Sequence, residues 1–277
     1  MAKKIAYLGP PGTFAEEAAL VFDKAARLVP FPSIRAVANA VSLSVAGVEE
    51  GVVPIENSIE GSVTDTLDLL IHESGVMIKC ELVLPIRHNL VAKPGININD
   101  VKVLYSIPQA LGQCREFVSL HFPKVPVVAA LSTAAAVEEM MASSQPAAAI
   151  GTARAAEIYG ATILASGIQD KASNETRFVI LAKKDHASTG HDKTSLCFAF
   201  SDDRPGVLVE TMQVFSKKGI NLTKVESRPS KEILGRYIFL IDLEGHREDT
   251  VIKKALAEVR PKTSMLKIFG SYPRYNK

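Results

Sequence analysis

The feature that most constrains the fold of this 277-residue chain is a recurring order of apolar strand, short turn and hydroxyl-capped helix. Residues 5–8 form an apolar strand, which turns through two glycines and two prolines into a helix. Thr13 and Glu16 have the spacing of a capping box at the start of that helix. The same order recurs where Ser106, Ser132 and Thr152 follow further apolar runs. Strands that alternate with helices in this way predict an α/β fold.

These caps also predict a kind of ligand. The first N–H groups of a helix have no partner within the helix, so a helix amino terminus stabilises an anion. Several such termini that meet at one cleft would bind a small polyanion, and carboxylates are the best candidates. Gln109 adds an amide at what we expect to be the third helical position after Ser106. The glycine-rich turn at residues 9–12 matches neither a phosphate loop nor a dinucleotide fingerprint.

Two polar segments lie at strand ends in the same region. Residues 174–178 place Thr176 and Arg177 at the start of the apolar run 179–182, where ligands gather in α/β sheets. An exposed ion pair is the alternative interpretation for Arg177. After the short strand 52–53, Glu56 and Asn57 either hold a turn by hydrogen bonds to the backbone or contact a substrate.

A polar segment at residues 185–193 divides the chain. We expect residues 1–184 to form one domain and residues 194–277 another. The second region predicts strand, helix, strand, strand, helix and strand in order, which is the βαββαβ unit. A small open sheet has edges that favour pairing with a second copy, so we expect a homo-oligomer through this region.

Composition excludes several classes of function. The net charge of +2 is scattered, without a basic stripe for nucleic acid, and no apolar stretch reaches the roughly 20 residues of a membrane span. The amino terminus lacks a signal-peptide pattern, which favours a cytoplasmic location. Cys80, Cys114 and Cys197 are widely spaced in apolar sequence and predict reduced, buried thiols. We expect His186 and His191 to be solvated and no metal to bind.

The motifs together resemble the prephenate dehydratase family, with an ACT regulatory domain at the end of the chain. The resemblance covers nearly the whole sequence. Ala15, Ile107 and Val207 depart from the residues that many members have at these positions. The segments that show the resemblance are Thr176-Arg177-Phe178, Pro54 to Ser58 with Gly61, Gly9-Pro10 with Gly12 to Phe14, Ser106 with Pro108 to Leu111, Gln113-Cys114, Gly206 to Val209 and Glu226 to Pro229.

The resemblance implies a two-lobed catalytic domain similar to periplasmic binding proteins, with residues 82–168 as the second lobe, followed by a ferredoxin-like ACT domain. It implies that prephenate loses carbon dioxide and its ring hydroxyl to give phenylpyruvate, in phenylalanine biosynthesis. No cofactor is required, because aromatisation drives the reaction. The expected catalytic residues are Thr176, Arg177, Glu56 and Asn57. The expected substrate-binding residues are Thr13, Phe14, Ser58, Ser106, Gln109, Gln113, Thr152 and Phe178.

The resemblance also implies that phenylalanine binds the ACT domain and inhibits the enzyme, within a homodimer or homotetramer. The expected effector residues are Gly206, Val207, Leu208, Val209, Glu226, Ser227, Arg228 and Pro229. Two alternatives remain open from the sequence: a dehydratase that acts on the amino analogue arogenate, and a non-catalytic amino-acid sensor. A solute receptor is disfavoured by the lack of an export signal.

Overall fold

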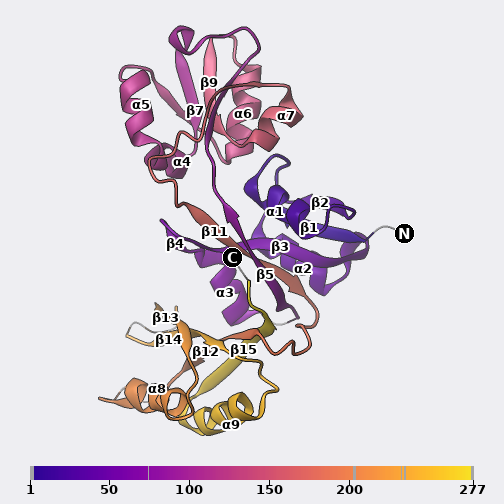
Figure 1. Cartoon of the computed structure of the whole chain (residues 1–277), viewed down its shortest axis with the longest axis vertical. Coiled ribbons are helices and arrows are strands. Elements are labelled where there is room, and N and C mark those ends of the chain that lie inside the picture. The colour runs from indigo at the N-terminus through magenta and orange to yellow at the C-terminus, as the bar shows by residue number, and fades with distance from the viewer. Residues whose placement is uncertain (1–2, 74, 202–203, 232, 234, 276–277) are drawn as a thin grey trace. The chain divides into compact units, whose positions relative to one another are not determined.

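The computed structural model describes residues 3–73, 75–201, 204–231, 233 and 235–275 of the chain (Figure 1). The chain divides into two compact units. The first unit consists of Met1–Thr64 and Leu82–Phe178, and the second of Asp65–Glu81 and Val179–Lys277. Within the described ranges, no helix is long and apolar enough to cross a membrane.

The first sheet has the strand order β2-β1-β3-β11-β5, with the short β4 paired to β3. Strands β1, β2 and β3 run parallel, as strand–helix alternation predicts. Helix α2 approaches β3 closely at Gly51, where a Cβ atom would lie 2.6 Å from Cγ1 of Val37. The elements are β1 (Lys4–Leu8), α1 (Phe14–Phe22), β2 (Arg27–Phe31), α2 (Ile34–Ser42), the 3-10 turn η1 (Val45–Gly47), β3 (Val48–Asn57), β4 (Gly61–Ser62), β5 (Met77–Pro85) and β11 (Glu175–Ala182).

The second sheet lies within the first unit and has the order β10-β6-β9-β7-β8. Strands β7, β8 and β9 are parallel, whereas β6 runs antiparallel to both β9 and β10. The two sheets give the two lobes that the sequence predicted. The elements are β6 (Asn89–Ala92), η2 (Ile98–Asp100), β7 (Val103–Ser106), α4 (Pro108–Gln113), α5 (Arg115–His121), β8 (Val127–Ala129), α6 (Thr133–Ala142), β9 (Ala147–Gly151), α7 (Ala153–Tyr159) and β10 (Thr162–Ser166).

The second unit contains the βαββαβ module, whose predicted element order is confirmed. Its sheet has the order β13-β14-β12-β15, and every pair is antiparallel. Helices α8 and α9 pack on one face of this sheet, around a core that includes Phe198 and Phe215 (Figure 1). The elements are β12 (Asp192–Ala199), α8 (Val207–Lys217), β13 (Leu222–Pro229), β14 (Tyr237–Glu244), α9 (Thr250–Val259), η3 (Arg260–Lys262) and β15 (Met265–Pro273).

Helix α3 (Thr64–His72) and the first half of β5 also belong to the second unit. The ammonium group of Lys267, on β15, donates to the main-chain carbonyls of Ile71 and Glu73 at the end of α3. A Cβ atom at Gly270 would collide with the backbone of Ile78. Residues 65–81 therefore pack against the module, an association that the sequence did not indicate.

The segment 185–193, which the sequence predicts to be a linker, is attached to the module by hydrogen bonds. The carboxylate of Asp192 accepts from the backbone N–H groups of Thr189 and Gly190. His246 bonds the main-chain carbonyl of His186 through Nε2 at 2.9 Å. Asp192 is already the first residue of β12, so the strand begins two residues earlier than the predicted domain start.

The cysteines are free thiols, in agreement with the sequence interpretation. Cys114 and Cys197 are buried, whereas Cys80 is only half-buried. Burial raises the pKa of the Cys114 thiol to about 12 and that of the Cys197 thiol to about 12. Both thiols are therefore protonated and poorly nucleophilic at neutral pH.

Candidate functional site

A cavity of about 490 Å³ in the first unit collects most of the residues that the sequence singled out. Its wall includes the end of β3 and the beginnings of β11, α1, α4 and α6. Of the predicted site residues, seven line it: Thr13, Phe14, Asn57, Gln109, Gln113, Thr176 and Phe178. None of the described lining residues is a lysine or an arginine.

Three of the four helix amino termini that the sequence predicted, those of α1, α4 and α6, contribute to this wall. Thr13 caps α1 by accepting from the N–H of Glu16 at 3.4 Å, and Ser132 caps α6 by accepting from the N–H of Ala135 at 2.9 Å. The third terminus, that of α4, begins with Ile107 at the cap position and Pro108 after it. The amino termini of three helices therefore border one space, where their partial positive charge favours an anion.

The prediction that Ser106 caps α4 is wrong. A residue before proline favours an extended backbone, which here makes Ile107 the cap residue and leaves Ser106 as the last residue of β7. Ser106 is buried, and its hydroxyl donates to the carbonyl of Ile107 at 3.0 Å. Its side chain is not among those that line the cavity.

Thr176 lies at the cavity wall with its hydroxyl held by an amide. Nδ2 of Asn57 donates to Oγ1 of Thr176 at 2.8 Å, across 119 residues of sequence. Oδ1 of Asn57 accepts from the N–H groups of Ile59 and Glu60, so the orientation of the amide is fixed. Because Oγ1 of Thr176 accepts this bond, its own O–H remains available as a donor.

A chain of side-chain hydrogen bonds extends from Asn57 into the second lobe. Nδ2 of Asn57 also donates to Oδ1 of Asn174 at 2.8 Å. Nδ2 of Asn174 donates to Oε1 of Gln113 at 2.8 Å, and Nε2 of Gln113 donates to Oε1 of Glu60 at 3.1 Å. His88 bonds the same Gln113 oxygen through Nε2 at 2.9 Å. With Thr176, five polar residues of the wall are thereby connected through buried Asn174.

Arg177 does not line this cavity. Successive residues of a strand point to opposite faces, so Thr176 and Phe178 share one face of β11 and Arg177 takes the other. Its guanidinium pairs with the carboxylate of Glu56 at 2.9 Å. The interpretation of Arg177 as a fork for substrate carboxylates therefore has no support from this geometry.

Ser58 and Thr152 also lie outside the wall, and hydrogen bonds account for both. The hydroxyl of Ser58 donates to the carbonyl of Ser173 and accepts from the N–H of Glu175. Thr152 is fully buried; it caps α7 and donates to the carbonyl of Gly12 at 2.6 Å. These hydrogen bonds hold the loops around the cavity. The geometry therefore gives no support to the assignment of Ser58 and Thr152 as substrate contacts.

Two titratable residues of the wall, Glu60 and His88, were not predicted from the sequence. His88 follows β5 and is 3% exposed, and its ring meets the ring of Phe14 edge-on at 5.7 Å. Burial lowers the pKa of His88 below its usual range, although the hydrogen bond to Gln113 acts in the opposite direction. A lone histidine between Arg87 and Asn89 gives no periodic signal that could have identified it.

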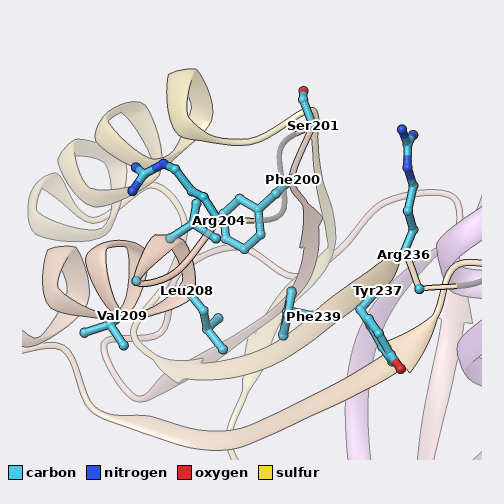
Figure 2. Close-up of a pocket in the computed structure, with 11 residues that line it drawn as sticks. Phe200, Ser201, Arg204, Leu208, Val209, Arg236, Tyr237 and Phe239 are labelled. Carbon is cyan, nitrogen blue, oxygen red and sulfur yellow. The ribbon is translucent and has the colours of Figure 1, made fainter.

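A second pocket, of about 420 Å³, lies in the second unit beside the start of α8 (Figure 2). Gly206, Val207, Leu208 and Val209, which the sequence assigned to an effector site, all line this pocket. Figure 2 shows Phe200, Leu208 and Phe239 gathered around this space, with Tyr237 and the cationic Arg236 on the β14 side. Gly206 has a φ of 88°, a left-handed conformation that glycine adopts without strain.

The segment Glu226 to Pro229 lies on the edge strand β13 and does not line this pocket. Ser227 is exposed and pairs in register with Phe239, so its side chain is on the face of the sheet that bears the pocket. Arg228 takes the opposite face and pairs with Asp68 of α3 at 3.3 Å. Strand alternation thus divides the predicted effector motif between two faces.

The fold and the cavity define a two-lobed α/β enzyme domain followed by a small regulatory module. Residues 5–186 match the family model described as prephenate dehydratase, and residues 196–261 match that of the ACT domain. A bifunctional chorismate mutase/prephenate dehydratase of Aquifex aeolicus is 44% identical over 272 residues, covering 98% of this chain and 74% of the relative.

Solved structures agree with the sequence matches. The prephenate dehydratase of Arthrobacter aurescens in complex with L-Phe superposes with a TM-score of 0.90 at 34% identity, covering 98% of this chain and 90% of that one. The chain belongs to the prephenate dehydratase family. A second neighbour, described as a novel type of quorum quenching acylase, has a TM-score of 0.87 at 27% identity, covering 99% of this chain and 98% of that one. Because one fold can support different chemistry, the site itself has to support the function.

Proposed function

We propose that the cavity of the first unit binds prephenate and converts it to phenylpyruvate. In this reaction the dianion takes up one proton and releases carbon dioxide and water. The C–C bond to the ring carboxylate breaks, its electron pair enters the ring, and the ring hydroxyl leaves with the electrons of its C–O bond. The observation that supports this assignment best is the presence of three helix amino termini and the Thr176 hydroxyl at one cavity.

Thr176 is the group we assign to the leaving hydroxyl. Asn57 occupies an acceptor site of Oγ1, so the Thr176 O–H is directed to an acceptor other than Asn57. A donor that is fixed before the reaction stabilises the developing negative charge without reorganisation. A threonine hydroxyl is a poor acid, so the proton itself comes from another group or from water.

The two carboxylates of prephenate are assigned to neutral donors. The first turns of α1, α4 and α6 offer N–H groups, and Gln109 contributes a side-chain amide. A helix amino terminus provides roughly half a positive charge together with directed donors. We therefore assign carboxylate recognition to these termini, and to Arg177 and Glu56 a supporting role in the neighbouring backbone.

Direct assay tests this proposal. Purified protein is incubated with prephenate and, separately, with arogenate, and phenylpyruvate or phenylalanine is followed by absorbance and chromatography. We expect turnover of prephenate in preference to arogenate. If the protein turns over neither substrate but binds phenylalanine, the result would support a non-catalytic amino-acid sensor instead.

We also propose that phenylalanine is the effector and binds the pocket beside α8. The N–H groups at the start of α8 suit a carboxylate, and the rings of Phe200 and Phe239 suit an aromatic side chain. The exposed side chains of Val225 and Ser227, on the edge strand, suit closure of the site by a second copy of the module. Calorimetry at several protein concentrations, together with light scattering, tests both binding and assembly as a dimer or tetramer.

A further inference from the structure

His88 is a buried imidazole whose protonation state can be worked out from its partners. Oε1 of Gln113 accepts from Asn174 at 2.8 Å, while Nε2 of the same Gln113 donates to the Glu60 carboxylate. An amide oxygen only accepts, so Nε2 of His88, which lies 2.9 Å from it, is the protonated nitrogen. Nδ1 is buried and has no hydrogen-bond partner within the part of the chain that the structure describes. The arrangement fits a neutral ring.

The hydrogen bonds beyond Gln113 have a defined direction toward Thr176. Gln113 accepts from Asn174, Asn174 accepts from Asn57, and Asn57 donates to Thr176 as well. If the amide of Gln113 turned over, its NH₂ group would face the NH₂ group of Asn174. Two donors cannot bond to each other, so the wrong orientation would break the chain at that point. The donor from His88 favours the correct orientation from the other side.

We infer that His88 is a positioning residue for the dehydration proposed above: its Nε2–H fixes the amide of Gln113, which in turn sets Asn174, Asn57 and the hydroxyl of Thr176. His88 acts as a hydrogen-bond donor rather than as a proton donor in the reaction. The Glu60 carboxylate secures the other end of the same amide at 3.1 Å. This inference depends on the proposed function, since it concerns the geometry of that site.

The first test compares three variants of His88 with one surface control. His88→Phe keeps a ring against Phe14 but removes the donor, and we expect kcat/KM to fall by roughly 10- to 100-fold, mainly through kcat, as small misplacements of a reacting group typically cause. His88→Gln places an amide N–H near the position of Nε2 and should restore activity to within about threefold of wild type, whereas the shorter His88→Asn should not. His121→Gln, on α5, serves as a surface control.

The Gln and Asn variants are both polar, so a difference between them does not reflect general loss of folding. Thermal unfolding of every variant records any change in stability separately. Equal activity of the Gln and Asn variants, or a wild-type rate for His88→Phe, would overturn the inference. Lack of prephenate turnover by the wild-type protein would instead overturn the proposed function.

The second test asks whether His88 acts through Gln113. In a double-mutant cycle with Gln113→Leu, we expect His88→Phe to have little further effect, because the residue that it positions is already absent. If the two losses multiply instead, His88 acts on the site by another route and the assignment as a positioning residue fails.

Discussion

The pockets of the two units differ in the side chains that line them. The wall of the cavity in the first unit has hydroxyls, amides and helix ends but no described lysine or arginine, whereas the pocket in the second unit includes Arg204 and Arg236. Short side chains such as Asn57 and Thr176 lose little conformational entropy when they are fixed, and arginine loses up to roughly 2 kcal/mol. We expect the cavity of the first unit to depend on fixed neutral donors, whereas the pocket of the second unit also carries arginines, of which Arg204 pairs with Glu210 at 2.6 Å.

The sharpest test of the first half of this comparison is Thr176→Val. The valine keeps the shape but removes the donor, so we expect kcat to fall by roughly 10²- to 10³-fold with substrate binding retained. Thr176→Ser should keep much of the rate. Steady-state kinetics of the three proteins measure the effect, and equal kcat for wild type and valine variant would remove Thr176 from the mechanism.

The association of residues 65–81 with the second unit can be tested by adding one methyl group. At Gly270 a Cβ atom meets the backbone of Ile78, which cannot move as a flexible side chain can. We expect Gly270→Ala to lower the free energy of unfolding by about 1–3 kcal/mol. Gly112→Ala is the control, because nothing lies within 4 Å of its Cβ position. Denaturant unfolding compares them, and equal stability would argue against this packing.

The division of the effector motif between two faces of β13 predicts two separable effects. Ser227→Ala should weaken phenylalanine binding, because Ser227 lies on the face that bears the pocket. Asp68→Asn should leave binding intact but raise the activity that remains at saturating phenylalanine about fivefold, near the lower limit of typical coupling energies, because it weakens the pairs with Arg228 and Lys231.

Calorimetry for binding and inhibition assays for coupling distinguish these two residues. Glu248→Gln, in an exposed pair with Lys253, is the control and should change neither quantity. If Asp68→Asn alters binding and inhibition in parallel, Asp68 contributes to phenylalanine binding itself and not to the coupling between phenylalanine binding and catalysis.

The smallest effect is expected at Arg177. Because Arg177 pairs with Glu56 and does not line the cavity, Arg177→Lys should leave KM unchanged and lower kcat by about threefold at most, since the ion pair can re-form. Glu56→Gln should produce a change of similar size. A large rise in KM for the lysine variant alone would show that Arg177 binds a substrate carboxylate, and would end the contrast between the two pockets.

Local patterns in the sequence were sufficient to predict the order of elements in the βαββαβ module and three of the four helix caps. Thr13, Ser132 and Thr152 cap the expected helices, and all six elements of the βαββαβ module occur in order. Such features depend on side-chain periodicity and on hydrogen bonds between residues close in sequence. At the fourth cap, the proline after Ile107 moved the helix start by one residue.

The hydrogen-bond partners of Thr176 and His88 were decided by tertiary structure. Asn57 meets Thr176 across 119 residues and Gln113 meets His88 across 25, because sheet order and the approach of the lobes bring their elements together. The face that Arg177 takes depends on which side of β11 borders the cavity. The sequence by itself determined which strands and helices form and which family they define. Only the packing of distant segments decided which side chains share the cavity, because such contacts leave no local periodicity in the chain.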